Sequence, residues 1–356
     1  MPVKLYVAKP FGPRPVMRLL DPEQREAVNK RRVLFKSLPS DFAITSYMTV
    51  DSVAECDFVI LPQTLRTKTP EWEHYFEDVR READAAGKRV IVFIGRDDSH
   101  KTHVDGAIVF KGSEYRHARH ENEIILSPFV EDLGDGRELA LRPKGEKPVV
   151  SFCGYAGFPD LRTRIRYHIK NALLDIASIY DPRLVVYKRG IYFRRAALRR
   201  LAGDARIQTA FTLRDSYGGN QETLSVSPEE SRREYIDSIL GSDLVLAPKG
   251  DANFSSRFFE TLSLGRIPIL IDTDMELPLE REIDYSSCIL RVDHAELSRL
   301  PEIIAEFWDR LSPERYEAMQ REARRTFREY LRYDSYFNRA LPLLRERGVA
   351  ALQGRS

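Results

Sequence analysis

The sequence predicts an α/β protein built from two doubly wound domains, and three observations lead to this fold class. Short apolar runs rich in β-branched residues alternate with longer amphipathic stretches, as strands alternate with helices. The apolar runs of the second half are continuous, which is typical of strands buried on both faces of a parallel sheet. A stretch rich in glycine, proline and charge, residues 131–148, separates the two halves. One large mixed sheet is the alternative that this pattern leaves open.

The first half contains four expected strands and one expected helix. The helix covers about residues 71–86, is strongly charged and ends at Gly87. With the linker as boundary, we expect a first domain over residues 1–145, a second over 146–330, and a C-terminal tail over 331–356 that packs back on the first domain. The expected strands are Leu5–Ala8, Phe58–Leu61, Val90–Ile94 and Ala107–Phe110.

The second half repeats the α/β pattern and closes with an arginine-rich helix. That helix is expected from Ser312 to about Leu331, because Ser312 followed by Pro313 is a good start signal. Its charged face either touches anionic lipid or is simply solvated, and the thin apolar stripe favours solvation. The expected strands are Val149–Cys153, Leu184–Tyr187, Leu244–Ala247, Ile267–Ile271 and Ile289–Val292.

Composition excludes several classes of protein. The net charge of +2 argues against a nucleic-acid partner, since no basic field covers the chain. Three widely spaced cysteines, with no CxxC pair, are expected as buried free thiols. The N-terminus resembles a first strand rather than a signal peptide, and no apolar run is long enough to span a bilayer. We therefore expect a cytoplasmic protein.

The segment from Ser227 onward carries the most consistent local signals. A capping box, Ser227 to Glu230, starts a helix that closes near Gly241. A buried strand, a loop over residues 248–254 and a new helix from Ser256 to Leu264 follow. This unit places a helix N-terminus at the carboxyl edge of a parallel sheet, where an anion such as a diphosphate is favoured.

Two charged residues near the start of the second helix are the leading site candidates. Arg257 lies in the first turn and can contact a phosphate with two N–H groups. Glu260 lies one turn later on the same side, where it can accept hydrogen bonds from ribose hydroxyls. The alternative is an ordinary surface ion pair between them. The spacing of a Walker loop and a GxGxxG after a strand are both absent, so neither a P-loop nucleotidase nor a dinucleotide dehydrogenase is indicated.

These residues also resemble a known family. The chain carries the run Tyr235–Asp251, YIDSILGSDLVLAPKGD, and its continuation Ser255–Ile269, SSRFFETLSLGRIPI. Farther on stand Glu276–Leu279, ELPL, and Ile283–Tyr285, IDY, which are similar to the family's ELPF and IDW elements. Over about sixty residues this segment resembles the exostosin family of glycosyltransferases, type GT47, whose fold is GT-B. Weaker similarities lie at Phe152-Cys-Gly154, in the Arg162/Arg164/Arg166 cluster and at Leu213-Arg-Asp215.

The resemblance implies a GT-B fold, two Rossmann-like domains facing a central cleft, and an inverting sugar transfer. The donor it implies is a nucleoside-diphosphate sugar, usually a uridine one, with no metal or other cofactor required. Ser255 and Arg257 would contact the diphosphate, Glu260 the ribose and Glu276 the donor sugar. The remaining candidate donor-binding residues are Ser256, Lys249, Gly250, Asn253, Arg164 and Arg214.

The acceptor side is less well defined. An inverting reaction needs a base, and Asp97, Asp98 and His100 follow an expected strand of the first domain, where α/β sheets bind ligands. A solvated turn with an Asx cap is the alternative at this position. We expect a glycan, lipid-linked glycan or other hydroxyl acceptor, which the resemblance does not identify. The arginine-rich C-terminal helix leaves open a peripheral contact with the inner face of a membrane. Eukaryotic exostosins carry an N-terminal anchor that is not evident here, so we expect a bacterial-type enzyme of surface polysaccharide synthesis.

Two further patterns have simple structural explanations. Asp272-Thr-Asp274 is a DxD at the end of a strand, for which a turn or cap is favoured over a metal site. The pairs His100/His103 and His117/His120 have a spacing found in zinc sites but lie in polar loops, so exposed histidines are favoured. The rival to an enzyme is a catalytically inactive protein that binds nucleotide sugars. A basic nucleic-acid-binding protein is disfavoured by the charge balance.

Overall fold

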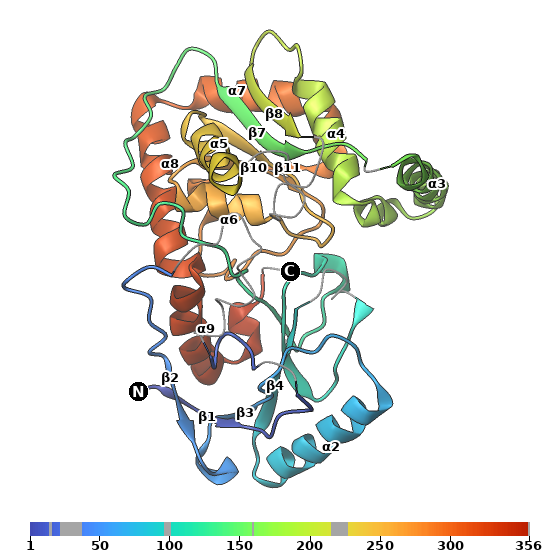
Figure 1. Ribbon diagram of the computed structural model, residues 1–356, viewed down its shortest axis with the longest axis vertical. Coiled ribbons are helices and arrows are strands. Elements are labelled where there is room, and N and C mark those ends of the chain that lie inside the picture. Colours follow the sequence, from blue (N-terminus) through green and yellow to red (C-terminus); the bar gives the residue numbers. More distant parts are fainter. Residues whose placement is uncertain (14–15, 22–37, 96–100, 159, 215–226, 355–356) are drawn as a thin grey trace.

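The computed structural model describes residues 1–13, 16–21, 38–95, 101–158, 160–214 and 227–354. These form two lobes, each built on a parallel sheet with helices beside it (Figure 1). The prediction of an α/β fold with two parallel sheets is confirmed, and the alternative of a single mixed sheet is wrong. The candidate bases Asp97, Asp98 and His100 lie outside the described residues.

The first sheet has the order β2-β1-β3-β4-β5-β6, and every pairing in it is parallel. Helix α2, Pro70–Ala85, lies between β3 and β4 in the chain and packs against β4. The strands are β1 (Val3–Val7), β2 (Tyr47–Val50), β3 (Phe58–Ile60), β4 (Arg89–Ile94), β5 (Ala107–Lys111) and β6 (Glu123–Ile125).

The second sheet has the order β11-β10-β9-β7-β8 and is also parallel throughout. Numbered within its own lobe and read from the opposite edge, this order is 2-1-3-4-5, the order that the first sheet shows before its sixth strand. Both are the doubly wound arrangement of Rossmann-like folds. The strands are β7 (Val149–Tyr155), β8 (Gln208–Arg214), β9 (Leu244–Ala247), β10 (Ile267–Asp272) and β11 (Leu290–Asp293).

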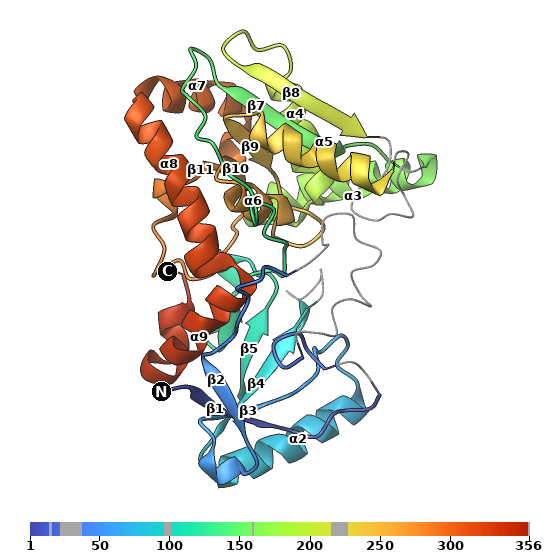
Figure 2. The ribbon, with the colours of Figure 1, turned by 60° about the vertical axis from the view of Figure 1, so that its left-hand side comes forward.

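The helices of the second lobe cover its sheet, and the last ones run on to the first lobe. Helix α5 packs on β7, and α6 packs on β9 and β10. Helix α8 and the π-turn after it lead to α9, which packs against β1 (Figure 2). The helices are α3 (Leu161–Ser178), α4 (Gly190–Leu201), α5 (Pro228–Leu240), α6 (Ser256–Ser263), α7 (Leu300–Arg310), α8 (Pro313–Thr326), the π-turn (Phe327–Leu331) and α9 (Tyr333–Arg347).

Local sequence signals fix several helix ends as predicted. The Ser227 hydroxyl accepts a hydrogen bond from the Glu230 N–H and starts α5. The Ser312 hydroxyl caps α8 in the same way. Gly265, with φ of 63°, follows the end of α6 in the left-handed conformation that a residue with a Cβ rarely adopts.

One expected strand is wrong. Residues 184–187 belong to a 3-10 helix, Pro182–Tyr187, rather than to the second sheet. Pro182 presets the first helical φ, and the Asp181 carboxylate accepts a hydrogen bond from the Arg183 N–H, so a helical turn starts there. The second strand of this lobe is instead β8, a mostly exposed edge strand whose apolar content is too low to have been predicted.

The carboxyl ends of the two sheets meet where the lobes join. Tyr115, in the segment after β5, forms an antiparallel bridge with Met275, in the segment after β10. Strand β6, the residues just after it and the C-terminal helices complete the junction. The Ser127 hydroxyl donates to the Leu331 carbonyl, and the Tyr336 hydroxyl donates to the Ile125 carbonyl at 2.9 Å. One apolar core therefore includes residues from β1, α6 and α9.

Candidate donor site

The candidate site lies at the switch point of the second sheet, outside the carboxyl ends of β7 and β9. In this strand order the chain leaves β7 and β9 toward opposite faces, which opens a crevice where α/β folds bind ligands. The loop after β9 enters α6 at this crevice. Ser255 is buried at the N-cap of α6, but its side chain makes no cap hydrogen bond, whereas Ser256 is exposed. First-turn N–H groups lack partners within a helix, so this end suits an anion.

Arg257 is held at the crevice by groups from β7. Its Nη2 donates to the Cys153 carbonyl at 2.7 Å, and its guanidinium carbon lies 4.2 Å from the centre of the Phe152 ring. Its Nε is buried and has no hydrogen-bond partner among the described residues. A buried N–H without an acceptor is costly, and a ligand oxygen is one acceptor that would remove this cost.

Gly154 permits this position of Arg257. Its φ of 155° is rare for residues with a side chain, and a Cβ placed on it would lie 2.8 Å from the Arg257 Nη2. A side chain at this position would therefore push the guanidinium away from the Cys153 carbonyl. The sequence indicated Gly154 only as part of a weak similarity, since a close approach between residues so far apart in the chain leaves no local signal.

Glu260 lies on the buried side of α6. Only 8% of the residue is exposed, and its carboxylate accepts a hydrogen bond from the Tyr235 hydroxyl of α5. Burial, and then the nearby Glu260 carboxylate, raise the pKa of Tyr235 well above its ordinary value, so the phenol stays protonated as a donor. A ribose hydroxyl would share this carboxylate with Tyr235. The ribose contact itself stays a prediction.

Lys249, in the loop after β9, is buried without a carboxylate partner in the described part of the chain. Its Nζ donates to the Val186 carbonyl at 2.5 Å and to the Tyr115 hydroxyl at 3.2 Å. Burial lowers the pKa of this amine to about 7. Gly250 beside it lies against Gly190, whose missing side chain leaves room for the loop carbonyls at the start of α4.

Asn253 connects the same loop to both lobes. Its amide nitrogen donates to the Glu114 carbonyl of the first lobe at 3.2 Å and to the Thr273 carbonyl at 3.3 Å. Its amide oxygen accepts from the Thr273 hydroxyl at 2.6 Å. Together with Lys249, Asn253 holds the loop in place through contacts within the protein. Whether either residue also touches the donor stays a prediction.

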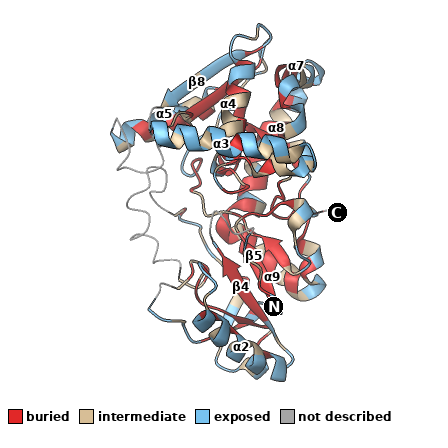
Figure 3. Ribbon diagram, turned by 90° about the vertical axis from the view of Figure 1, so that its right-hand side faces the viewer, coloured by how far each residue is buried: buried red, intermediate tan, exposed pale blue. Residues whose placement is uncertain are grey.

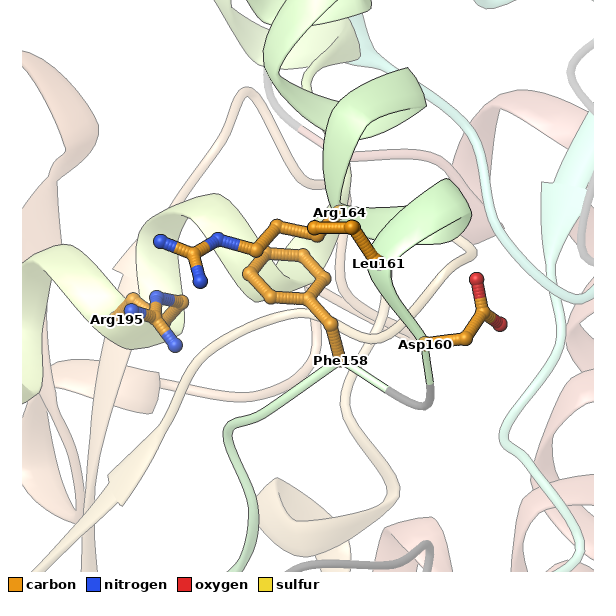
Figure 4. A pocket seen from close by; sticks show the side chains of 5 residues that line it. All are labelled: Phe158, Asp160, Leu161, Arg164 and Arg195. Atoms are coloured by element: carbon orange, nitrogen blue, oxygen red, sulfur yellow. The ribbon is translucent and has the colours of Figure 1, made fainter.

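A pocket of ≈ 430 Å³ opens between the start of α3 and the middle of α4. Figure 4 shows the guanidinium groups of Arg164 and Arg195 on one side of the Phe158 ring, with the Asp160 carboxylate on the other. Arg195 lies 5.2 Å from the centre of that ring and donates to the Ala156 carbonyl at 2.8 Å. Both pocket arginines therefore stand close to the segment that follows β7.

Two further groups at the end of β7 were not predicted. The Tyr155 hydroxyl is buried with no hydrogen-bond partner among the described residues. Arg194 of α4 donates to the Tyr155 carbonyl at 2.5 Å. Phe193, Ala197 and Leu201 have the i, i+4, i+8 spacing of a buried helix face. That spacing is the signal that could have placed Arg194 and Arg195 on a helix beside the crevice.

Arg214 makes its described contacts with α5. Its guanidinium donates to the Ser231 hydroxyl at 2.6 Å and to the Glu234 carboxylate at 2.7 Å, so it fastens the end of β8 to that helix. A donor contact of Arg214 stays a prediction.

Glu276 is buried at the junction of the lobes. Its Oε1 accepts from the Arg119 guanidinium at 2.6 Å and from the Gly354 N–H at 2.7 Å. Its Oε2 is buried and has no hydrogen-bond partner among the described residues. Burial is the largest influence and raises the pKa of this carboxyl. The expected contact between Glu276 and a donor sugar stays a prediction.

The DxD residues take part in contacts between the lobes. Asp272 Oδ1 accepts from the Met275 N–H at 2.8 Å, which is the expected turn, and its Oδ2 accepts from Arg116 at 2.9 Å. Asp274 pairs with the ring of His117. Of the other histidines in the two pairs, His103 bonds to Glu123 at 3.0 Å. The expectation that no metal is required stays a prediction.

The comparisons with known proteins identify the family. The model of the Exostosin GT47 domain matches residues 49–307, most of the chain. The chain therefore belongs to the exostosin GT47 family and carries a glycosyltransferase domain, and its two Rossmann-like lobes have the GT-B architecture of such enzymes. Among curated proteins, it is 31% identical over 104 residues to an Exostosin-1 homolog of Caenorhabditis elegans. It is 33% identical over 76 residues to Exostosin-1 of Drosophila melanogaster.

These likenesses cover only part of each protein. The matched segments span 29% and 21% of this chain, and 26% and 10% of the two relatives. A solved glycosyltransferase of Rickettsia africae aligns over 97% of this chain and 98% of its own, at 10% identity and a TM-score of 0.37. An alpha-glucosyltransferase solved with UDP-glucose and DNA containing an abasic site aligns over 95% and 97%, at 12% identity and a TM-score of 0.36. TM-scores this low carry no further argument.

In the described part of the chain, no helix combines the length and apolarity needed to cross a membrane.

Proposed function

We propose that the chain transfers a sugar from a nucleoside-diphosphate donor to a hydroxyl acceptor, with the donor diphosphate bound at the start of α6. One observation carries the proposal above the others. Arg257 lies at the switch point of the second sheet, and its buried Nε has no acceptor among the described residues. A phosphate oxygen is the acceptor that suits a guanidinium at a helix N-terminus.

The charges around the crevice support an anionic ligand. Arg257 stands at α6, while Arg164 and Arg195 line the neighbouring pocket from α3 and α4. The dipole of α6 adds a partial positive charge at the same edge of the sheet. A diphosphate carries the negative charge and the several acceptor oxygens that such a set of donors can bind together.

In the proposed sugar transfer, negative charge develops on the departing diphosphate. The acceptor oxygen bonds to the anomeric carbon as the bond from that carbon to the diphosphate oxygen breaks, and the nucleoside diphosphate leaves with the electron pair. Arg257 and the α6 N-terminus stabilise the charge that grows on the leaving oxygens. A base takes the acceptor proton. Attack on the face opposite the leaving group inverts the anomeric configuration.

For the finer identity of the substrates, the proposal takes its support from the resemblance to the family. We take uridine as the donor nucleoside, with no metal required, and a glycan or lipid-linked glycan of surface polysaccharide synthesis as the acceptor. Asp97, Asp98 and His100 come shortly after β4 in the sequence, and we propose them as bases on that ground alone.

A thermal-shift screen of nucleotide sugars tests the donor site. We expect uridine-diphosphate sugars to raise the melting temperature of the wild type and to have far less effect on Arg257→Ala. Arg310→Ala is a matched control, because that side chain is on the outer face of α7 and is 81% exposed. Equal stabilisation of wild type and Arg257→Ala would place the donor elsewhere.

Turnover separates an enzyme from an inactive binding protein. The enzyme releases free nucleoside diphosphate when a glycan acceptor is added to its stabilising donor. Stabilisation by a donor without release, across a panel of hydroxyl acceptors, would favour the inactive binding protein instead.

A further inference from the structure

Helix α3 presents a row of large apolar side chains to solvent. Seven of the ten exposed large apolar residues in the described part of the chain lie on this helix or directly after it. In Figure 1 the helix stands at the outer edge of the second lobe, and Figure 3 shows pale blue, exposed residues along much of it. The seven are Leu161, Ile165, Ile169, Leu173, Ile176, Ile179 and Tyr180.

Their spacing places them on one face. Steps of four, four, four and three residues lead from Leu161 to Ile176, which keeps these side chains within a single stripe at 3.6 residues per turn. The opposite face of the helix carries its attachments to the protein. Asn171 is buried, and the Tyr167 ring lies 4.8 Å from the Phe158 ring. In an ordinary surface helix the apolar stripe faces the core, so α3 has the reverse orientation.

The stripe is flanked by positive charge. Four of the first ten residues of α3 are basic, Arg162, Arg164, Arg166 and Lys170, and none is acidic. The one acidic residue of the helix, Asp175, is paired with Lys188 on the protein side. At 100° per residue, Arg162, Arg166 and Lys170 follow one edge of the stripe, and Arg164 lies beyond the other edge.

The arginine-rich helix α8 is different. Arg321 pairs with Glu317 at 2.9 Å, and Arg325 pairs with Glu329 at 2.8 Å. The apolar side chains of α8, among them Tyr316 and Met319, are buried in the protein. The charged face of α8 is therefore a solvated set of ion pairs, and the helix offers no exposed apolar stripe.

We propose that α3 docks on a bilayer that contains anionic lipid, lying in the plane of its surface. Its apolar stripe would enter the boundary between headgroups and acyl chains, while Arg162, Arg166 and Lys170 along one edge contact lipid phosphates. Leu161 and Arg164 at the start of the helix also line the pocket beside the donor site. Docking through α3 thus places that pocket next to a membrane-embedded acceptor, although the docking itself does not depend on the proposed transfer reaction.

Charge favours a membrane over a second copy of the chain. Two α3 stripes packed in parallel would bring their basic edges near one another, where like charges repel, and an antiparallel pair would leave the basic half of each helix without an anionic partner. An anionic bilayer meets the same stripe and the same charges with complementary partners. Burial of the stripe in the bilayer removes its apolar surface from water, which is favourable.

Co-sedimentation of the full chain with vesicles tests the proposal. One set is pure phosphatidylcholine, and the other contains about 30% phosphatidylglycerol, enough to give an anionic surface. We expect the wild type to bind the anionic vesicles, to bind the neutral ones much less, and to dissociate as salt rises to about 0.5 M, where the Debye length falls to a few ångströms. Leu173→Glu should lower the partition coefficient by at least about tenfold, because it places a charge in the stripe far from the donor pocket.

Leu213→Glu is the matched control. Both residues are exposed leucines, 63% for Leu173 and 58% for Leu213, and the control residue lies on the edge strand β8. The control variant should bind anionic vesicles like the wild type. Equal melting temperatures of the three proteins would show that both variants fold.

Three results would overturn the proposal. The first is a wild type that stays in solution with either kind of vesicle. The second is a Leu173→Glu variant that binds as well as the control. The third is a wild type that forms a dimer by light scattering, loses it in Leu173→Glu and binds no vesicles. That result would assign the stripe to a second copy of the chain.

Discussion

The two sheets share the strand order 2-1-3-4-5, yet their switch points are built differently. In the first lobe, Gln63 closes the crevice between β1 and β3. Its amide oxygen accepts from the Phe11 N–H at 2.7 Å, and its amide nitrogen donates to the Gly12 carbonyl at 3.2 Å. In the second lobe, Arg257 stands in the corresponding crevice with a buried Nε that has no partner among the described residues.

This difference shows that the strand order determines where a crevice forms, whereas the loop residues determine whether that crevice can bind a ligand. The neutral amide of Gln63, in the loop after β3, hydrogen-bonds to the backbone of Phe11 and Gly12 and so holds the two loops together. A guanidinium anchored through one N–H and stacked on Phe152 keeps other N–H groups for a ligand. The same fold therefore carries a structural contact in one lobe and a candidate anion site in the other.

The largest expected effect concerns the chemistry that the first lobe is proposed to add. Replacing the true base among Asp97, Asp98 and His100, by Asp→Asn or His→Gln, should lower kcat by about a hundredfold to ten-thousandfold. The affinity for the nucleoside diphosphate should stay unchanged, because binding is assigned to the second lobe. Steady-state kinetics with parallel titrations measure both. If all three variants keep the wild-type kcat, the base lies elsewhere.

A smaller effect is expected when the second crevice is perturbed without touching Arg257 itself. Gly154→Ala should lower affinity for a uridine nucleotide by about tenfold or more, because the new Cβ would displace a guanidinium whose charge-assisted bonds are worth about 1.5–3 kcal/mol. Gly203→Ala is the control, since its φ of 81° is similarly unfavourable but its Cβ would meet open space. Equal losses in the two variants would trace the effect to backbone strain alone.

A substitution in the crevice of the first lobe should lower the stability of the protein without changing its affinity for the nucleotide. Gln63→Ala removes a buried amide that connects two loops and leaves the Phe11 N–H without its acceptor, so the free energy of unfolding should fall by about 1–3 kcal/mol. Chemical denaturation measures this loss. A large drop in nucleotide affinity in the same variant would contradict the division of roles between the lobes.

The smallest expected effect is a pH dependence of the free energy of unfolding, caused by Lys249 behind the second crevice. Its folded pKa of about 7 lies below the ordinary value of 10.5. In that interval the unfolded chain binds more protons, so the contribution of Lys249 to stability rises with pH, by about 2 kcal/mol between pH 7 and 9. Lys249→Met should remove this rise.

Lys68→Met is the control for that experiment. Lys68 lies on the surface near Glu73, with a side chain that is 40% exposed, and its replacement should leave the pH dependence as in the wild type. Denaturation curves at several pH values measure the slope. A wild-type slope in Lys249→Met would show that other groups cause the pH dependence.

Much of the second lobe could be predicted because its signals are local. Continuous apolar runs indicate β9 and β10, and Ser227, Ser312 and Gly265 mark helix ends through bonds to neighbouring residues. The start of α6 was also predicted correctly at Ser256, although the Ser255 side chain makes no cap hydrogen bond there. For this reason the amino-acid sequence alone is enough to place Arg257 at a sheet edge.

The rest depended on contacts between distant residues or broke the usual pattern. Cys153 and Arg257 are 104 residues apart in the sequence, and Arg119 and Glu276 are 157 residues apart. No local motif can therefore indicate either contact. The edge strand β8 is largely exposed and lacks an apolar run. Helix α3 turns its apolar stripe outward, so its periodicity says nothing about a core.

The central claim is that Arg257 binds the donor diphosphate, and calorimetric titration of UDP and of uridine tests it most directly. Arg257→Gln should weaken UDP binding by about tenfold to a hundredfold, the loss of a charge-assisted contact, and leave uridine binding unchanged, because the nucleoside has no phosphate. Arg310→Gln should bind both ligands like the wild type. Undiminished UDP binding by Arg257→Gln, or equal losses for UDP and uridine, would contradict the account.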